Sequence, residues 1–231
     1  MTLNKAKGRM FKSVGWTWNP IWGCSHNCKY CWAESLAKRW GKDFGPQFRE
    51  HFLTDKMPND GTWIFVGSMG DTFCWGVPDE WIVKLLLSIK EDESNNTFLL
   101  QTKNPTRFQN FFEILLEIKD KIVLGTTIET TWNTPWSEAP ATDSRAEHLG
   151  IMKNLGFKTF LSLEPLAEFN EVTLKRWIRK IKPEAVEIGL ENYTNFTDKP
   201  KETRIINLLS WLTTNGFTYV LKENLRHLED S

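Results

Sequence analysis

The chain has 231 residues, of which 40% are hydrophobic and 25% are charged, a composition typical of a globular domain. Its 29 basic and 29 acidic side chains give a formal net charge of zero, so overall charge does not indicate a nucleic-acid or membrane partner. No apolar stretch is long enough to cross a bilayer, and residues 1–12 lack the apolar core of a secretory signal. We therefore expect one cytoplasmic domain over residues 1–231, with no membrane contact and with a basic N-terminal extension over residues 1–14.

Charge is unevenly spread along the chain. Residues 1–50 contain nine Lys or Arg against three Asp or Glu, a balance of +6, and residues 51–231 contain twenty against twenty-six, a balance of −6. Such asymmetry indicates that the N-terminal part docks with a partner.

Short β-rich runs alternate with amphipathic helical stretches. The predicted strands cover residues 15–19, 63–67, 97–101, 122–127, 159–163, 185–190 and 218–221. The predicted helices cover residues 32–40, 79–90, 105–118, 145–154, 172–181 and 203–214. Several strands are almost continuously apolar, which is typical of parallel strands covered on both faces.

This alternation predicts right-handed βαβ units and a parallel sheet. The fold class is therefore α/β, and because the chain is short for a full eight-unit barrel of ~250 residues, we expect a partial (β/α)6 barrel. A doubly wound open sheet is the structural alternative. The barrel is favoured because polar residues follow almost every predicted strand, at the end that carries the active site in such barrels. These residues are Ser68, Asp71, Lys103, Glu129, Glu164, Glu191 and Lys222.

Three of the four cysteines, Cys24, Cys28 and Cys31, lie within eight residues between the first predicted strand and the first helix. In a reducing compartment this spacing indicates metal ligation rather than disulfides. Three thiolates on one loop can ligate three irons of a 4Fe–4S cluster and leave the fourth iron open to a substrate. Zinc is the alternative metal, but it requires four ligands, and only His26 or Cys74 can supply the fourth.

The run Cys24-x-x-x-Cys28-x-Tyr30-Cys31 resembles the signature of the radical S-adenosylmethionine superfamily. Its context in residues 16–34, together with residues 66–71 and 101–105, is similar to a phage- and bacteria-encoded three-cysteine subgroup of unknown function, distantly similar to spore photoproduct lyase. The resemblance implies a partial (β/α)6 barrel with the cluster at its open top. It also implies that the cluster cleaves S-adenosylmethionine reductively to a 5′-deoxyadenosyl radical, which takes a hydrogen atom from an unknown substrate.

The resemblance further implies where S-adenosylmethionine binds. A turn after the second strand accepts the cofactor ammonium, and glycine in that turn allows a close backbone approach. The implied contacts are Tyr30 with the adenine, Ser68, Gly70 and Asp71 with the ammonium, Lys103 with the carboxylate, and Thr127, Glu129, Ser162 and Glu164 with the ribose hydroxyls and the sulfonium.

Cys74 lies in the loop after the second predicted strand, at the expected mouth of the barrel. There a thiol can donate a hydrogen atom to a substrate radical, which makes Cys74 a candidate catalytic residue. Packing as a buried apolar residue and ligation of a metal are the alternatives.

The expected partners are an electron donor and a substrate. Small bacterial donors such as flavodoxin and ferredoxin are acidic and complement the basic first fifty residues. The chain is little more than a catalytic core, so a macromolecule that closes the site itself, either nucleic acid or protein, is a candidate substrate.

A second functional hypothesis is a zinc-stabilised nucleic-acid-binding module. Its support is the set of tryptophans interleaved with basic residues, which can grip a single strand by stacking and charge. The zero net charge and the tendency of tryptophan to be buried argue against it. The tryptophans concerned are Trp16, Trp18, Trp22, Trp32 and Trp40.

Overall fold

The computed structural model describes residues 3–8, 10–192 and 198–228, and within these residues eight strands form one sheet. The strand order is β1-β2-β5-β6-β7-β8-β9-β10, in which β1 is antiparallel to β2 and every other neighbouring pair is parallel. The strands are β1 (Asn4–Lys5), β2 (Val14–Trp18), β5 (Trp63–Val66), β6 (Thr97–Gln101), β7 (Ile122–Thr127), β8 (Thr159–Leu163), β9 (Ala185–Ile188) and β10 (Tyr219–Leu221). A separate pair joins β3 (Ile21–Trp22) to β4 (Gln47–Phe48).

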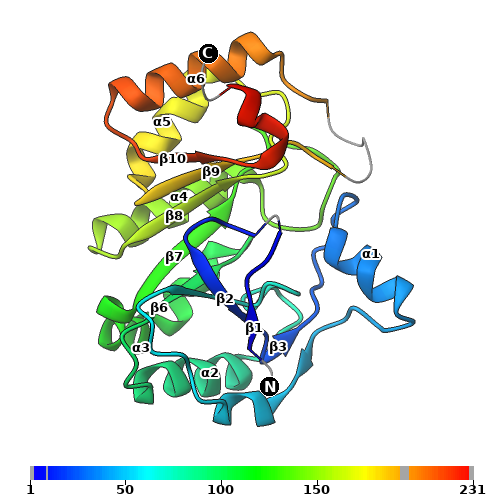
Figure 1. Ribbon diagram of the computed structural model, residues 1–231, viewed down its shortest axis with the longest axis vertical. Helices are drawn as coiled ribbons and strands as arrows, with labels where there is room; N and C mark the ends of the chain where they lie inside the picture. Colours follow the sequence, from blue (N-terminus) through cyan, green and yellow to red (C-terminus); the bar gives the residue numbers. More distant parts are fainter. Residues whose placement is uncertain (1–2, 9, 193–197, 229–231) are drawn as a thin grey trace.

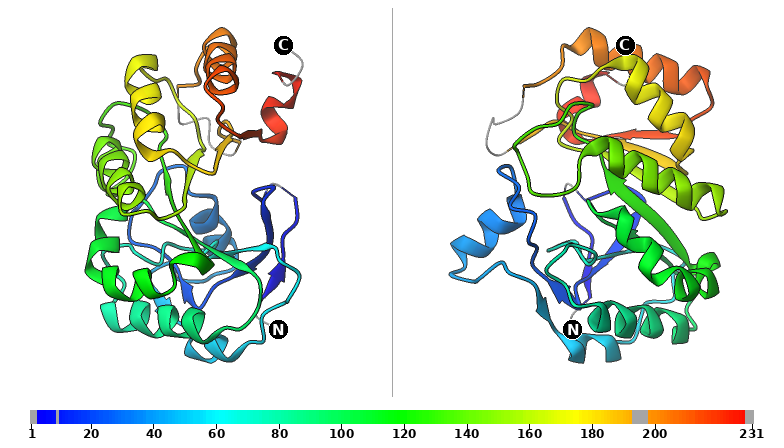
Figure 2. Two further views of the ribbon diagram at one scale, coloured as in Figure 1. Left: turned by 90° about the vertical axis from the view of Figure 1, so that its left-hand side faces the viewer. Right: turned by 180° about the vertical axis from the view of Figure 1, so that it is seen from behind.

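Helical connections join the successive parallel strands (Figure 1). Figure 2 shows most of these helices on one side of the curved sheet, while α1 projects away from it in Figure 1. The helices are α1 (Trp32–Arg39), α2 (Asp79–Glu91), α3 (Phe112–Glu117), α4 (Thr142–Asn154), α5 (Glu171–Ile181) and α6 (Glu202–Thr214), with short 3₁₀ segments η1 (Glu50–Thr54), η2 (Pro105–Phe111), η3 (Lys119–Lys121) and η4 (Glu223–Leu228).

The α/β partial-barrel prediction is confirmed. The parallel strands follow one another in sequence order, without the reversal that defines a doubly wound sheet. The edge strands β1 and β10 do not pair with each other, so the sheet remains an open half-barrel. Within the described ranges, no helix combines the length and the apolar character that a bilayer crossing requires.

Alternate residues of each strand pack on opposite faces of the sheet. In β6, Phe98 and Leu100 join the large core beneath the helices, whereas Leu99 between them joins a smaller cluster inside the half-barrel. Val123 and Phe160 from the next two strands belong to the same inner cluster. This inner cluster fills the lower part of the half-barrel, and polar inner-face residues follow it at the carboxyl ends of the strands.

The N-terminal segment completes the inner cluster. The Phe11 ring lies 5.4 Å from Phe65 and 5.0 Å from Phe160, measured between ring centroids. Leu3, Phe11 and Val14 are buried, and β1 pairs with β2. Leu3, Phe11 and Val14 therefore anchor the described part of the expected N-terminal extension to the fold, while Lys5, Lys7 and Lys12 are exposed.

The predicted helix over residues 105–118 is divided into η2 and α3. Pro105, Phe108 and Phe111 are all buried, and their spacing of three residues matches the three residues per turn of a 3₁₀ helix. Burial of this single stripe accounts for the tighter winding before α3 begins.

Candidate functional site

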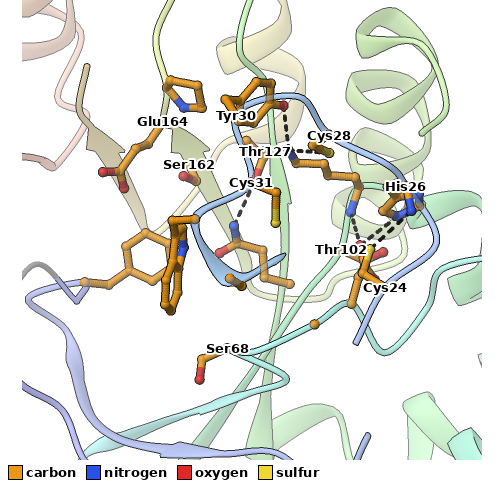
Figure 3. A pocket seen from close by; sticks show the side chains of 18 of the residues that line it. Cys24, His26, Cys28, Tyr30, Cys31, Ser68, Thr102, Thr127, Ser162 and Glu164 are labelled. Carbon is orange, nitrogen blue, oxygen red and sulfur yellow. Dashed lines mark hydrogen bonds and ion pairs between the residues drawn. The ribbon is translucent and has the colours of Figure 1, made fainter. Parts of the chain in front are cut away.

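A cavity of about 320 Å³ opens at the carboxyl ends of the parallel strands (Figure 3). The cysteine loop, residues 23–31, forms one wall, and the strand ends form the others. Of the predicted site residues, only Glu129 and Cys74 do not line this cavity. The predicted residues that do line it are Cys24, Cys28, Tyr30, Cys31, Ser68, Gly70, Asp71, Lys103, Thr127, Ser162 and Glu164.

Two glycines allow the cysteine loop to lie against the turn after β5. Gly23 adopts a left-handed φ of 82°, and its amide donates to the carbonyl of Met69 at 3.0 Å. The amide of Asp71 donates to the carbonyl of Gly23 at 3.1 Å. A Cβ on Gly70 would lie 2.3 Å from that carbonyl oxygen. The close backbone approach expected at Gly70 is therefore made to Gly23.

The sulfur of each loop cysteine accepts a hydrogen bond. The amide of His26 donates to Cys24 Sγ at 3.4 Å, and the amide of Glu34 donates to Cys31 Sγ at 3.3 Å, so that Cys31 caps α1. Lys103 Nζ donates to Cys28 Sγ at 3.5 Å. Hydrogen bonds to cysteine sulfur stabilise its negative charge and are characteristic of iron–sulfur ligation, so this donor set fits a cluster.

Two thiols of the loop, Cys24 and Cys31, are difficult to ionise without a positive charge beside them. Burial raises the pKa of Cys31, and the pKa of Cys24 is raised by its hydrogen bond with Cys74 and by burial. Buried thiolates require a compensating positive charge, which iron supplies. No three His, Cys, Asp or Glu side chains in the described parts of the chain are grouped closely enough to hold a single metal ion.

Asp71 connects the cysteine loop to the next strand end. Its Oδ2 pairs with His26 Nε2 at 2.9 Å and accepts from the amide of Lys103 at 2.8 Å, while Oδ1 accepts from the amide of Phe73 at 3.0 Å. Burial opposes ionisation, but His26 and these hydrogen bonds lower the pKa of Asp71. Asp71 therefore lies at the cavity wall with both oxygens already bonded to the protein.

Ser68 is positioned by a residue that the sequence reading did not select. Asn19 Oδ1 accepts from Ser68 Oγ at 3.3 Å and from the amide of Met69 at 2.7 Å. Asn19 directly follows β2, so its position at a strand end was the available signal.

A buried ionic network lies behind Cys28. Glu129 Oε1 accepts from the hydroxyl of Tyr30 and from Lys103 Nζ, the latter at 2.8 Å, and Oε2 accepts from Arg145 Nη1 at 2.8 Å. Lys103 Nζ also donates to the hydroxyl of Tyr30 at 2.6 Å. Burial alone would raise the pKa of Glu129, but Arg145 and Lys103 outweigh it and lower the pKa from 4.5 to about 2.

Glu129 consequently lies behind Tyr30 rather than at the surface of the main cavity. It borders a smaller cavity of about 180 Å³ beneath residues 132–142. Two cations and a phenol hold its carboxylate there, which explains why it does not face the main cavity. Arg145 was not identified from the sequence, because nothing in the pattern of α4 connects it to Glu129, sixteen residues earlier.

The opposite wall of the cavity carries Glu164 and Lys222. Lys222 Nζ lies 3.5 Å from Glu164 Oε2 and 3.3 Å from Glu187 Oε2. Burial raises the pKa of Glu187, which is fully enclosed.

Gln101 also lines the cavity and donates to Thr127 Oγ1 at 2.9 Å. The sequence could have identified Gln101, because it lies two residues after the inward-facing Leu99 and therefore on the same face of β6.

Cys74 is fully buried and lies outside the lining of the main cavity. Cys24 and Ser25 are the neighbours that lower the pKa of its thiol. It therefore lies behind the cysteine loop rather than at the mouth of the barrel.

The tryptophans near the cysteine loop have mixed environments. Trp18 and Trp22 are buried, whereas Trp32 is 42% exposed and Trp40 is 51% exposed. Trp22 stacks with Trp40, and the Arg49 guanidinium lies 4.2 Å from the centre of the Trp22 ring. Part of the set predicted for nucleic-acid binding is thus core.

Comparison with known proteins identifies the fold and the family of the chain. The fold is that of spore photoproduct lyase and SuiB, which are radical S-adenosylmethionine enzymes with a partial barrel. Residues 11–182 match the model of the family described as "Protein of unknown function (DUF5131)", and the chain belongs to this family. It is also similar to uncharacterized protein ORF301 of Acidianus two-tailed virus, with 23% identity over 78% of this chain and 65% of the viral protein.

The structural likeness extends over most of the chain at low identity. A mutant spore photoproduct lyase with bound AdoMet and dinucleoside spore photoproduct superposes with a TM-score of 0.59 and 11% identity, covering 81% of this chain and 60% of the lyase. SuiB of Streptococcus suis bound to S-adenosylmethionine superposes with a TM-score of 0.56 and 13% identity, covering 89% of this chain and 49% of SuiB. SuiB bound to its precursor peptide SuiA superposes with a TM-score of 0.55 and 15% identity, covering 89% of this chain and 48% of SuiB. The chain thus spans less than two thirds of the length of each of these proteins.

Proposed function

We propose that this protein is a radical S-adenosylmethionine enzyme in which Cys24, Cys28 and Cys31 ligate a 4Fe–4S cluster. The observation that carries the proposal is that three sulfurs from one loop, each accepting a hydrogen bond, line the same strand-end cavity. Such a cluster supplies an electron that cleaves S-adenosylmethionine to a 5′-deoxyadenosyl radical.

The ligand geometry supports a cluster over zinc. A structural zinc requires four donors around one ion, whereas a cubane cluster receives each cysteine on a different iron. Cys24, Cys28 and Cys31 reach one cavity from a single loop, which suits three different irons of one cubane.

The remaining lining residues suit the binding of S-adenosylmethionine. The cavity volume lies within the ~300–1,000 Å³ typical of small-molecule sites. Ser68 on one side and Thr127 and Ser162 on the other offer hydroxyls to the amino-acid and ribose parts. Since both oxygens of Asp71 are bonded to the protein, we assign Asp71 to positioning the turn that receives the ammonium.

The substrate class is also a proposal. A cavity of this volume is largely filled by the cofactor, so the substrate approaches from outside and covers the mouth. The likeness to SuiB with a bound precursor peptide and to a lyase with a bound dinucleoside is consistent with a macromolecular substrate, either protein or nucleic acid.

Anaerobic reconstitution tests the proposed function. We expect wild-type protein to bind about four irons per chain, to show a reduced-cluster EPR signal, and to release 5′-deoxyadenosine from S-adenosylmethionine with a reductant. Each of Cys24→Ala, Cys28→Ala and Cys31→Ala should lose both the signal and the cleavage. If any of these variants keeps a full cluster and normal cleavage, or if the wild type binds one zinc instead, the proposal is wrong.

A further inference from the structure

The ionic network behind Cys28 has an unbalanced charge. Lys103 and Arg145 are cations, and Glu129 is the carboxylate between them. The side chains of Glu129 and Arg145 are each 4% exposed and that of Lys103 is 17% exposed, so solvent compensates little of the surplus positive charge. An uncompensated buried charge is strongly destabilising, so a further anion is needed beside the network.

Cys28 provides the place for that anion. Its sulfur is 3.5 Å from Lys103 Nζ, the cation nearest to the loop. A 4Fe–4S cluster with three thiolate ligands would keep a net negative charge once the irons are counted, and this charge beside Lys103 would balance the surplus cation. The network is therefore arranged around a ligated Cys28.

Arg145 is the fixed end of the network. Its Nε donates to the carbonyl of Pro140 at 2.6 Å and its Nη1 donates to the carbonyl of Thr127 at 3.0 Å, in addition to Glu129. Arg145 binds Oε2 of Glu129, and Lys103 and Tyr30 share Oε1. Lys103 is thereby held between Glu129 and Cys28 instead of pairing with both carboxylate oxygens.

We propose that Arg145 is a positioning residue which, through Glu129, holds the Lys103 ammonium against the Cys28 sulfur, and that this buried cation raises the reduction potential of the cluster. The inference rests on the proposed function, because it requires a cluster on Cys28. Reduction adds one electron from the external donor, and a fixed positive charge beside a ligating sulfur stabilises the reduced state.

An EPR-monitored redox titration without S-adenosylmethionine tests this role, because no cofactor contact of Lys103 contributes. Lys103→Met leaves Glu129 paired with Arg145, and we expect the equilibrium constant for reduction to fall about tenfold, which is about 59 mV for one electron. Arg145→Met should lower the potential in the same direction by a smaller amount, and Arg145→Lys should restore most of that loss. Lys222→Met is the matched control. It removes a buried cation whose printed ion pairs are with Glu164 and Glu187, and its shift in potential should be clearly smaller than that of Lys103→Met.

The outcomes separate the two proposals. A wild-type protein that assembles no cluster overturns the proposed function. A wild-type cluster whose potential is unchanged in both Lys103→Met and Arg145→Met overturns the inference alone, as does an equal shift in Lys222→Met. If Lys103→Met binds no iron, the comparison of Arg145→Met with Arg145→Lys decides, and equal potentials in these two variants contradict the positioning role.

Discussion

The ionisation of Glu129 illustrates how single residues stabilise the site. Its pKa of about 2 in the folded chain lies below the 4.5 of an unperturbed glutamate. The carboxylate therefore stabilises the fold fully above the unfolded pKa, and this stabilisation is lost as the pH falls through the folded pKa. The difference corresponds to about 3 kcal/mol.

We accordingly predict that Glu129→Gln destabilises the protein at pH 7 by about 3–5 kcal/mol, because Lys103 and Arg145 lose their shared anion. The difference between the wild type and Glu129→Gln in free energy of unfolding should decrease as the pH falls from 5 to 2. Urea unfolding at a series of pH values measures it. Glu117→Gln, which breaks an exposed pair with Lys90, should cost at most about 1 kcal/mol at every pH. If the loss of stability in Glu129→Gln did not depend on pH, Glu129 would not be the ionised partner of Lys103 and Arg145.

A single substitution distinguishes the three possible roles of Cys74, which are packing, metal ligation and hydrogen donation. Its thiol is enclosed behind Cys24, which favours packing over hydrogen donation to a substrate. We expect Cys74→Ala to retain the cluster and the cleavage of S-adenosylmethionine, with a loss of stability of about 1 kcal/mol. Loss of iron would identify a ligand, and a retained cluster with an altered product on the true substrate would support the hydrogen-donor hypothesis.

At the scale of elements, the close contact between the turn after β5 and the cysteine loop depends on glycine. A Cβ at position 70 would lie 2.3 Å from the carbonyl oxygen and 2.7 Å from the amide nitrogen of Gly23, so the two backbones would have to separate. We predict that Gly70→Ala reduces the iron content after reconstitution several-fold and lowers the melting temperature.

Gly150→Ala is the control for this prediction. The nearest atoms to its added Cβ belong to the Lys180 side chain, with Cγ at 2.7 Å, so a side chain rather than the backbone of the cysteine loop must shift. Alanine is favoured over glycine inside a helix such as α4 by about 1 kcal/mol, which offsets part of that cost. This variant should keep a wild-type iron content. Normal cluster assembly by Gly70→Ala would show that the contact between the turn and the loop is dispensable.

At the scale of the whole molecule, the uneven charge predicts how the protein meets its electron donor. The first fifty residues carry a balance of +6, and several of their cations lie on or beside α1, which begins directly after Cys31. An acidic flavodoxin or ferredoxin should associate faster with such a surface. We expect the rate of cluster reduction by this donor to fall as salt rises from 0.1 M to 1 M, because the screening length shortens from about 10 Å to about 3 Å.

Charge reversal at the end of α1 and just beyond it tests where the donor docks. Arg39→Glu and Lys42→Glu together should slow reduction at low salt several-fold and have little effect at high salt, while reduction by a small uncharged reductant is unchanged. Stopped-flow measurement of the donor reaction provides the rates. A rate that does not depend on salt in the wild type would leave the basic segment without this role.

The sequence by itself determined the fold class and the position of the cysteine loop. Strands such as residues 97–101 and 159–163 were predicted with the observed bounds, because continuous apolar runs form buried parallel strands whatever their neighbours. The placement of polar residues after the strands brought Ser68, Asp71, Lys103 and Glu164 to one cavity, since the carboxyl ends of parallel strands meet at one edge.

The tertiary structure alone decided which of these residues face the cavity and which support it. Glu129 and Cys74 follow predicted strands just as Glu164 does, yet Glu129 is held behind Tyr30 by Arg145, and Cys74 is packed behind Cys24. Both outcomes depend on partners that are distant in the sequence, and the pattern of a strand or helix does not encode such contacts. The strand order determines the position of the backbone of each residue, whereas buried charge and close packing determine which way its side chain points.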